Sequence, residues 1–278
     1  MPLKTNDLTP NIGTLVETDA ATLVSGAVST EICALIQQRG VLVLRGCAMN
    51  DAEQLAFTRT LGPVLDEKSG EVYKVTYDPR ESPELWFYTP GNFFWHIDRT
   101  DSDVPPFLTM LNAKRLPDSG GDTHFANTYA AYEALPDSDK TLIDRLKVVH
   151  RVEASFRFVP DLSDEQRAAF RAHGPKVHPM VWRHRDGRKS LITSTSSLEI
   201  VGMGQAEGEA LLQRMMDWAT QARFVYVHKW QLGDIVMWDN TGTMHKARPY
   251  AEDSGRLLHR TIVLGDEPFD PERERAAA

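Results

Sequence analysis

Two short stretches of the sequence carry side chains that suit a metal ion. His96 and Asp98 stand two residues apart, and His245 follows a β-rich segment that ends in a polar turn. On a β-strand, residues i and i+2 share a face, so His96 and Asp98 can reach one ion together. Two imidazoles and one carboxylate on one face of an ion, with other positions left open, form the ligand set of non-haem iron(II) sites.

A His-x-Asp pair alone is weak evidence, because such pairs are common by chance. This pair stands at the end of an aromatic run, residues 86–88 and 93–95, which is unusual for an exposed loop but is also compatible with a simple core. The remaining histidines have no partner at ligand spacing. His124, in Gly-Gly-Asp-Thr-His, fits a pocket wall and a surface position equally well.

Two arginines after His245, Arg256 and Arg260, are candidates for anion binding. An iron site with three open positions can hold a 2-oxo acid at two of them and O2 at the third, and a dicarboxylate co-substrate then needs a cation for its far end. Arg256 is suited to this, because the planar guanidinium binds carboxylates in a bidentate fashion. Arg260 lies four residues on, so a strand would place both on one face. The alternative for Arg256 is a surface ion pair.

Composition narrows the class of protein. The 278 residues are 41% hydrophobic and 25% charged, with a net charge of -8, which excludes a collagen, a coiled coil and a disordered chain and disfavours nucleic-acid binding. No apolar run reaches membrane-spanning length, and the first twenty residues lack a secretory pattern. Cys33 and Cys47 stand in apolar contexts without a CxxC pattern, so we expect a reduced, cytoplasmic protein.

The elements that must position these residues are mostly strands. No repeat or linker divides the chain, so we expect one domain over residues 1–278, mainly β with flanking helices. Short strands separated by turns predict a double-sheet jelly roll. Nucleotide-binding and serine-hydrolase motifs are absent. The pattern predicts helices over 30–38, 51–61, 163–174 and 206–220, strands over 41–44, 107–113, 224–230, 235–238 and 260–264, and an irregular aromatic segment over 64–94.

Several motifs together resemble the taurine dioxygenase/TfdA family of iron(II)- and 2-oxoglutarate-dependent dioxygenases. The resemblance covers nearly the whole chain, with the motifs in family order. They are Val41–Gly46, Leu61-Gly62-Pro63, Asn92–Asp98, Ser119–Thr123, Met237–Asn240 with His245, and Arg256–Asp266. The resemblance implies a double-stranded β-helix (jelly roll) enzyme that uses Fe(II), 2-oxoglutarate and O2, acts on a small-molecule substrate, releases succinate and CO2, and often forms dimers or tetramers.

Site roles follow from the resemblance residue by residue. It implies iron ligation by His96, Asp98 and His245, 2-oxoglutarate binding by Thr123 and Arg256, and substrate binding by Arg260 and Asn92. In related halogenases a small residue replaces the carboxylate ligand, so Asp98 favours hydroxylation over halogenation, although desaturation stays open.

The substrate class is inferred from two features that distinguish this sequence from the taurine enzyme. The histidine that the taurine enzyme uses upstream of the His-x-Asp pair has no counterpart between Val64 and Pro90, where aromatic residues stand instead. The segment from Phe224 to Asn240 looks closer to the aryloxyalkanoate branch. We therefore expect an amphiphilic organic acid, hydroxylated near its anionic end. Alternatives are an alkyl sulfonate or sulfate ester, a secondary-metabolite intermediate, a zinc hydrolase that uses the same triad, and a non-catalytic jelly-roll binding module.

Overall fold

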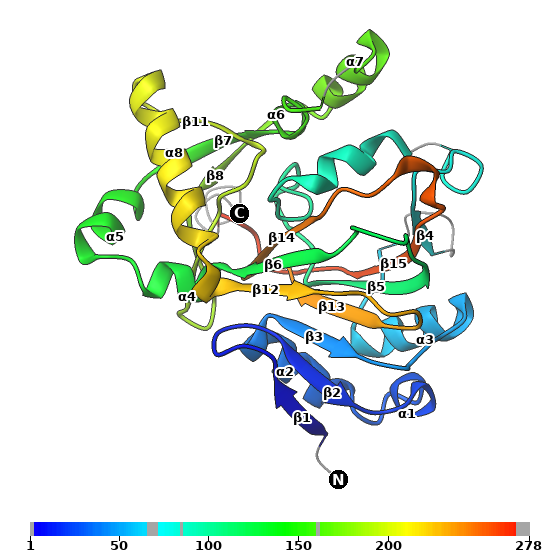
Figure 1. Cartoon of the computed structure of the whole chain (residues 1–278). Helices are drawn as coiled ribbons and strands as arrows, with labels where there is room; N and C mark the ends of the chain where they lie inside the picture. The colour runs from blue at the N-terminus through cyan, green and yellow to red at the C-terminus, as the bar shows by residue number, and fades with distance from the viewer. Residues whose placement is uncertain (1–2, 66–71, 84–85, 160–161, 271–278) are drawn as a thin grey trace.

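A computed structural model describes residues 3–65, 72–83, 86–159 and 162–270 (Figure 1). Mixed strands and helices make up this part of the chain. Its helices include none that combines the length and apolar character needed to cross a bilayer. Residues 271–278 lie outside the described residues, as do residues 66–71 and 84–85 of the aromatic segment.

The largest sheet has seven strands in the order β1-β2-β3-β13-β5-β15-β4. All neighbours pair antiparallel except β2 and β3, which are parallel. Its strands are β1 (Lys4–Asp7), β2 (Thr14–Glu17), β3 (Val41–Leu44), β13 (Ile235–Asp239), β5 (Leu108–Arg115), β15 (Leu257–Val263) and β4 (Tyr73–Val75).

Alternation along these strands divides their side chains between two faces. On one face Leu42, Leu44 and Met237 pack against helices. On the other face Val43 and Trp238 join a second core cluster with residues of β6 and β12. The second cluster therefore joins the large sheet to the three-stranded sheet β12-β6-β14, whose strands are β12 (Val225–His228), β6 (Thr123–Asn127) and β14 (Thr243–Ala247).

Helices α1 (Ala20–Val24), α2 (Ser29–Arg39) and α3 (Asp51–Leu61) lie on the far side of the large sheet, in the lower part of Figure 1. α3 begins in a capping box: Asn50 accepts a hydrogen bond from the Glu53 backbone, and the Glu53 side chain accepts one from Asn50. Cys33 is half-buried and Cys47 buried beside these helices, and both are free thiols.

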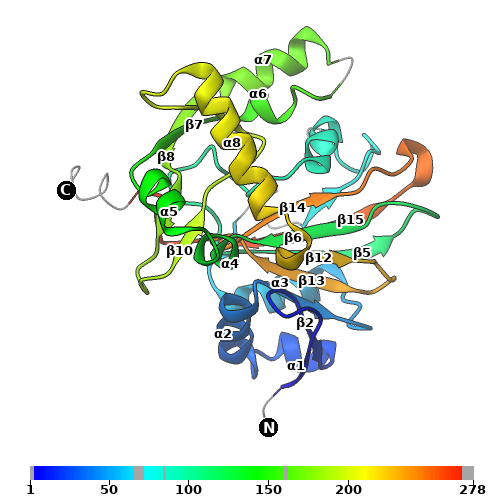
Figure 2. The same cartoon turned by 60° about the vertical axis from the view of Figure 1, so that its left-hand side comes forward.

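A third core cluster lies at the other end of the molecule, where α8 (Gln205–Ala219) crosses the small sheets (Figure 2). The remaining elements are η1 (Trp86–Phe93), α4 (Thr128–Glu133), α5 (Asp137–Ile143), β7 (Lys147–Arg151), α6 (Val152–Ser155), α7 (Asp164–Ala172), β8 (Pro175–Pro179), β9 (Val181–Arg183), β10 (Lys189–Leu191), β11 (Ser197–Ile200), η2 (Ala222–Phe224) and η3 (Glu252–Ser254). β11-β7-β8 and β10-β9 form the two small sheets.

Most predicted elements are confirmed, with three differences in extent. The predicted strand 224–230 is shorter, because Phe224 ends the 3-10 helix η2 and the strand stops at His228. β15 begins at Leu257 rather than at Arg260, because it pairs with β5 along its whole length. The described part of the aromatic segment contains one short strand, β4, and the 3-10 helix η1.

Candidate metal centre and adjoining cavities

The two halves of the candidate metal site meet through a single backbone bridge. The backbones of His96 and His245 form two hydrogen bonds with each other, at 3.0 and 2.8 Å, although the two residues are 149 positions apart in the sequence. This bridge places both imidazoles on the same side of the chain. Our expectation that His96 and Asp98 share a strand is wrong: His96 forms an isolated bridge, and Asp98 lies in the turn that follows. The turn nevertheless directs the carboxylate toward the rings.

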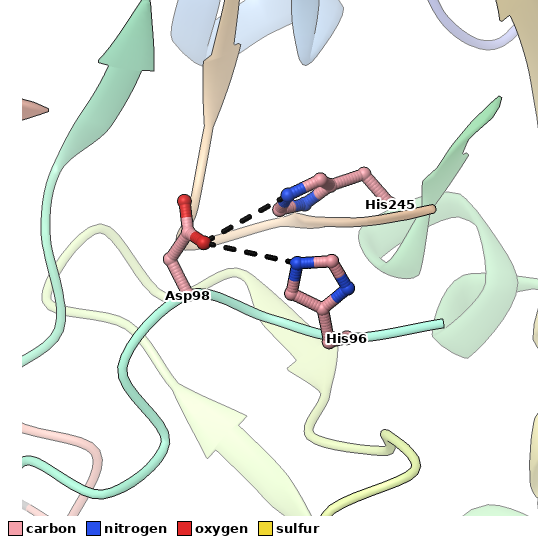
Figure 3. Close-up of side chains that lie close together, drawn as sticks. All are labelled: His96, Asp98 and His245. Carbon is pink, nitrogen blue, oxygen red and sulfur yellow. Dashed lines mark ion pairs between the residues drawn. The ribbon is translucent and has the colours of Figure 1, made fainter. Parts of the chain in front are cut away.

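The three side chains converge on one small space (Figure 3). The Nε2 atoms of His96 and His245 lie 4.0 and 3.8 Å from Oδ1 of Asp98, and the three ligand atoms all lie within 4.8 Å of one another. These separations are too long for hydrogen bonds. They are short enough for one ion at about 2 Å from each atom to contact all three. The donor set therefore fits iron(II).

Hydrogen bonds from outside the set hold two of the three ligands. Nδ1 of His96 donates to the Phe94 carbonyl at 2.8 Å, which leaves the lone pair of Nε2 directed at the site. Oδ2 of Asp98 accepts from the Thr109 hydroxyl at 2.7 Å. Thr109 in turn accepts from Asn240 at 2.8 Å, which leaves only Oδ1 of Asp98 to face the imidazoles. Nδ1 of His245 is buried and has no such partner among the described residues.

The protonation states suit metal binding. Burial lowers the pKa of His245 to about 3, and the neighbouring His96 adds to this effect, so the His245 ring is neutral. Burial alone would raise the pKa of Asp98, yet the nearby His245, His96 and Arg260 outweigh it and lower that pKa. A neutral imidazole and an ionised carboxylate are the forms that coordinate a cation.

One cavity beside the triad is lined by every side chain that we singled out. Its walls include His96, Asp98, His245, Thr123, Arg256, Arg260 and Asn92. Arg256 is 3% exposed, which rules out the alternative of a surface ion pair. Its Nη2 donates to the Gly121 carbonyl at 3.2 Å, whereas its Nε has no partner among the described residues. A buried guanidinium with unused donors calls for an anionic ligand.

The Gly-Gly-Asp-Thr motif shapes this cavity. Gly120 and Gly121 have φ of 75 and 74°, a region that favours glycine. A Cβ on Gly120 would lie 2.3 Å from the Pro249 carbonyl oxygen, and one on Gly121 would lie 3.1 Å from Nε of Arg256. Thr123 follows, and its hydroxyl accepts a hydrogen bond from Nε1 of Trp230 at 3.0 Å. Because that bond uses a lone pair, the hydroxyl hydrogen stays available to a ligand.

A second cavity adjoins the first and shares part of its lining. The volume open to the centres of water molecules is about 330 Å³ in this cavity and about 50 Å³ in the first. Asn92, His96 and Arg260 line both. Its further walls combine aromatic and polar side chains: Tyr88 packs edge-on against Phe156, with ring centroids 5.8 Å apart, and Arg99, Asp101 and His173 also line the cavity. The guanidinium of Arg260 lies 4.2 Å from the centre of the Tyr73 ring.

Sequence reasoning missed three residues that complete the site. Thr109, Trp230 and Tyr250 contact Asp98, Thr123 and Arg256 respectively. No local pattern pointed to any of the three, because each contact joins segments that meet only in the folded chain.

Three comparisons with known proteins agree with this geometry. The family model described as "Taurine catabolism dioxygenase TauD, TfdA family" matches residues 4–262. The chain is 33% identical to the alpha-ketoglutarate-dependent 2,4-dichlorophenoxyacetate dioxygenase of Cupriavidus pinatubonensis over 85% of this chain and 88% of that one. It is 27% identical to the alpha-ketoglutarate-dependent sulfate ester dioxygenase of Pseudomonas putida over 85% and 81%. The crystal structure of AAD-2 in complex with Mn(II) and N-oxalylglycine superposes with a TM-score of 0.83, at 31% identity, covering 97% of this chain and 100% of that one.

Proposed function

Since the chain belongs to the TauD/TfdA family of 2-oxoglutarate-dependent dioxygenases, which use Fe(II) and O2, we propose that it hydroxylates an amphiphilic organic acid. The observation that carries this proposal is the pair of cavities that share Arg260, Asn92 and the candidate metal ligand His96. The smaller cavity takes 2-oxoglutarate, and the larger one takes the substrate.

The fold is proposed to be a double-stranded β-helix (jelly roll) that forms one dioxygenase domain over residues 1–278. The core cluster between the large sheet and β12-β6-β14 supports this. Such a fold encloses a site between two rigid walls, open at one end.

The metal site is assigned to His96, Asp98 and His245. Bound there, iron(II) supplies the oxidative decarboxylation of 2-oxoglutarate to succinate and CO2, coupled to insertion of oxygen into a substrate C–H bond. The protein holds and orients the groups: Thr109 fixes the Asp98 carboxylate, and the Phe94 carbonyl fixes the His96 ring.

The co-substrate site is assigned to Arg256 and Thr123. Arg256 binds the far carboxylate of 2-oxoglutarate through its guanidinium, whose Nε no described residue uses, and Thr123 contributes its hydroxyl hydrogen. Burial of Arg256 strengthens this attraction, because solvent screens it little.

The substrate site is assigned to Arg260, Asn92 and the aromatic walls of the larger cavity. Arg260 lies where the two cavities meet, so an acid group bound to it would place the adjoining carbon near the metal. The rings of Tyr88 and Phe156 suit an apolar body behind that acid group. A small sulfonate such as taurine would leave this space unfilled.

The test compares acids with their neutral amides. Release of succinate is measured with phenoxyalkanoic and alkanoic acids and the corresponding amides, in the wild type and in Arg260→Ala. We expect the wild type to prefer the acid and Arg260→Ala to lose most of that preference. Equal turnover of acid and amide by the wild type, or unchanged acid turnover in Arg260→Ala, would contradict the role of Arg260.

A sulfate ester is the second candidate substrate, favoured by the likeness to the Pseudomonas putida sulfate ester dioxygenase. Hydroxylation of the carbon that bears a sulfate ester would release inorganic sulfate and an aldehyde. Alkyl sulfates in the same succinate assay, with sulfate measured in parallel, separate the two candidates.

A further inference from the structure

Tyr250 lies on the wall of the smaller cavity, between the metal ligand candidate His245 and Arg256 in the chain. The guanidinium carbon of Arg256 lies 4.6 Å from the centre of its ring. Two further rings clamp it edge-on: Tyr77 at 5.4 Å and Phe93 at 5.7 Å between centroids. Tyr250 therefore has a fixed ring position beside the buried cation.

The hydroxyl group of Tyr250 has a hydrogen to give and nothing to receive it. The oxygen is buried and has no hydrogen-bond acceptor among the described residues. Arg256 lies beside it, but arginine carries only donors, so any contact between them uses a lone pair of the phenol oxygen. Burial also raises the pKa of Tyr250, so the hydroxyl keeps its hydrogen at neutral pH.

Two unused donors, the Tyr250 hydroxyl and Nε of Arg256, thus belong to neighbouring residues that line one desolvated space. Leaving both unpaired is costly, and a carboxylate satisfies both at once, because each of its oxygens accepts more than one hydrogen bond. A ligand that ends in a neutral methyl group would satisfy neither.

We propose that Tyr250 is a positioning residue for 2-oxoglutarate, donating a hydrogen bond to the far carboxylate that Arg256 binds. This inference rests on the proposed co-substrate site. It makes Tyr250 a determinant of which 2-oxo acid the enzyme accepts, since the contact discriminates a dicarboxylate from a 2-oxo acid with an apolar tail.

The test measures binding without turnover. Calorimetric titrations are made anaerobically with Mn(II) in place of Fe(II), using 2-oxoglutarate and 2-oxopentanoate, which lacks the far carboxylate. Tyr250→Phe keeps the ring, and with it the stacking on Arg256. We expect it to weaken 2-oxoglutarate binding about ten-fold, as loss of a hydrogen bond to a charged group does, and to leave 2-oxopentanoate binding unchanged.

Tyr77→Phe is the matched control. It removes a hydroxyl from the same aromatic cluster, but Tyr77 does not line the cavity, so neither ligand should bind differently. The proposal is overturned if Tyr250→Phe leaves 2-oxoglutarate binding intact, or if it weakens both ligands equally, which would indicate a packing role.

Arg256→Met separates this proposal from the one on which it rests. If Arg256→Met binds 2-oxoglutarate as tightly as the wild type, the co-substrate does not occupy this cavity, and the proposed site fails together with the role of Tyr250. If Arg256→Met weakens binding and Tyr250→Phe does not, the site stands and only the role of Tyr250 is wrong.

Discussion

The two cavities that meet at Arg260 are built in different ways. Strand pairing and buried polar contacts fix the smaller one: the His96–His245 bridge, the Thr109–Asp98 hydrogen bond and the burial of Arg256. The larger one is walled by η1, α6 and the residue after α7, which meet through aromatic contacts and through the hydrogen bond of Tyr88 with His173 at 3.2 Å.

This difference separates chemistry from selectivity. Polar contacts in a sheet fix directions closely, as metal coordination and carboxylate binding require. Stacked rings supply shape and apolar surface, and substitutions among them can alter the room for a substrate without moving the metal ligands. We therefore expect changes in the sheet region to affect metal and co-substrate, and changes in the helical wall to affect stability and substrate choice.

The largest effect is expected from the metal ligands. Asp98→Ala should abolish turnover and weaken Mn(II) binding by at least about a hundred-fold, more than loss of an outer hydrogen-bond partner costs. Asp101→Asn is the control, because Asp101 pairs with His173 at 3.0 Å and is outside the triad. Normal metal binding in Asp98→Ala, measured by calorimetry, would refute the assignment of the triad.

The next effect concerns the aromatic wall. Phe156 is buried and stacks on Phe170, with centroids 3.8 Å apart. Phe156→Ala should lower the free energy of unfolding by about 3–5 kcal/mol and leave 2-oxoglutarate affinity unchanged. Phe158→Ala, at a side chain that is 58% exposed, should change stability by less than about 0.5 kcal/mol. A large loss of 2-oxoglutarate affinity in Phe156→Ala would show that the two cavities are not independent.

A smaller effect tests the charge buried at the end of β13. Burial raises the pKa of Asp239 to about 6, above the ordinary 3.8, so the folded state favours the protonated form. The protonated Asp239 side chain therefore stabilises the folded state fully below pH 3.8, and this stabilisation is lost as the pH rises to 6. The free energy of unfolding is measured in urea for Asp239→Asn and for the wild type. The difference between them should shift by about 2–3 kcal/mol in favour of the variant as the pH rises from 4 to 7. A pH-independent difference would contradict this.

Local patterns predicted much of the sheet region. Short continuous apolar runs indicated β3 and β13, and the Ser163–Gln166 capping box marked the beginning of α7. The side chains that we singled out for the metal and co-substrate do line one cavity.

The rest depends on contacts between distant segments. β4 has three residues and exists because it pairs with the edge of β15, which no local pattern reveals. Asp98 reaches the rings through a turn rather than a strand. Tyr250 stands in a connecting segment, and only the fold places it against Tyr77 and Phe93. Sequence periodicity describes one element at a time, so it cannot report such contacts.

The most direct test of the account is an anaerobic titration of the iron(II) protein with 2-oxoglutarate, followed by visible absorption. The wild type should develop a weak charge-transfer band. Asp98→Ala should give none, and Arg256→Met should need about ten to a hundred times more 2-oxoglutarate, as expected for loss of a charge-assisted contact of about 1.5–3 kcal/mol. No band in the wild type, or an unchanged titration in Arg256→Met, would contradict the proposed site.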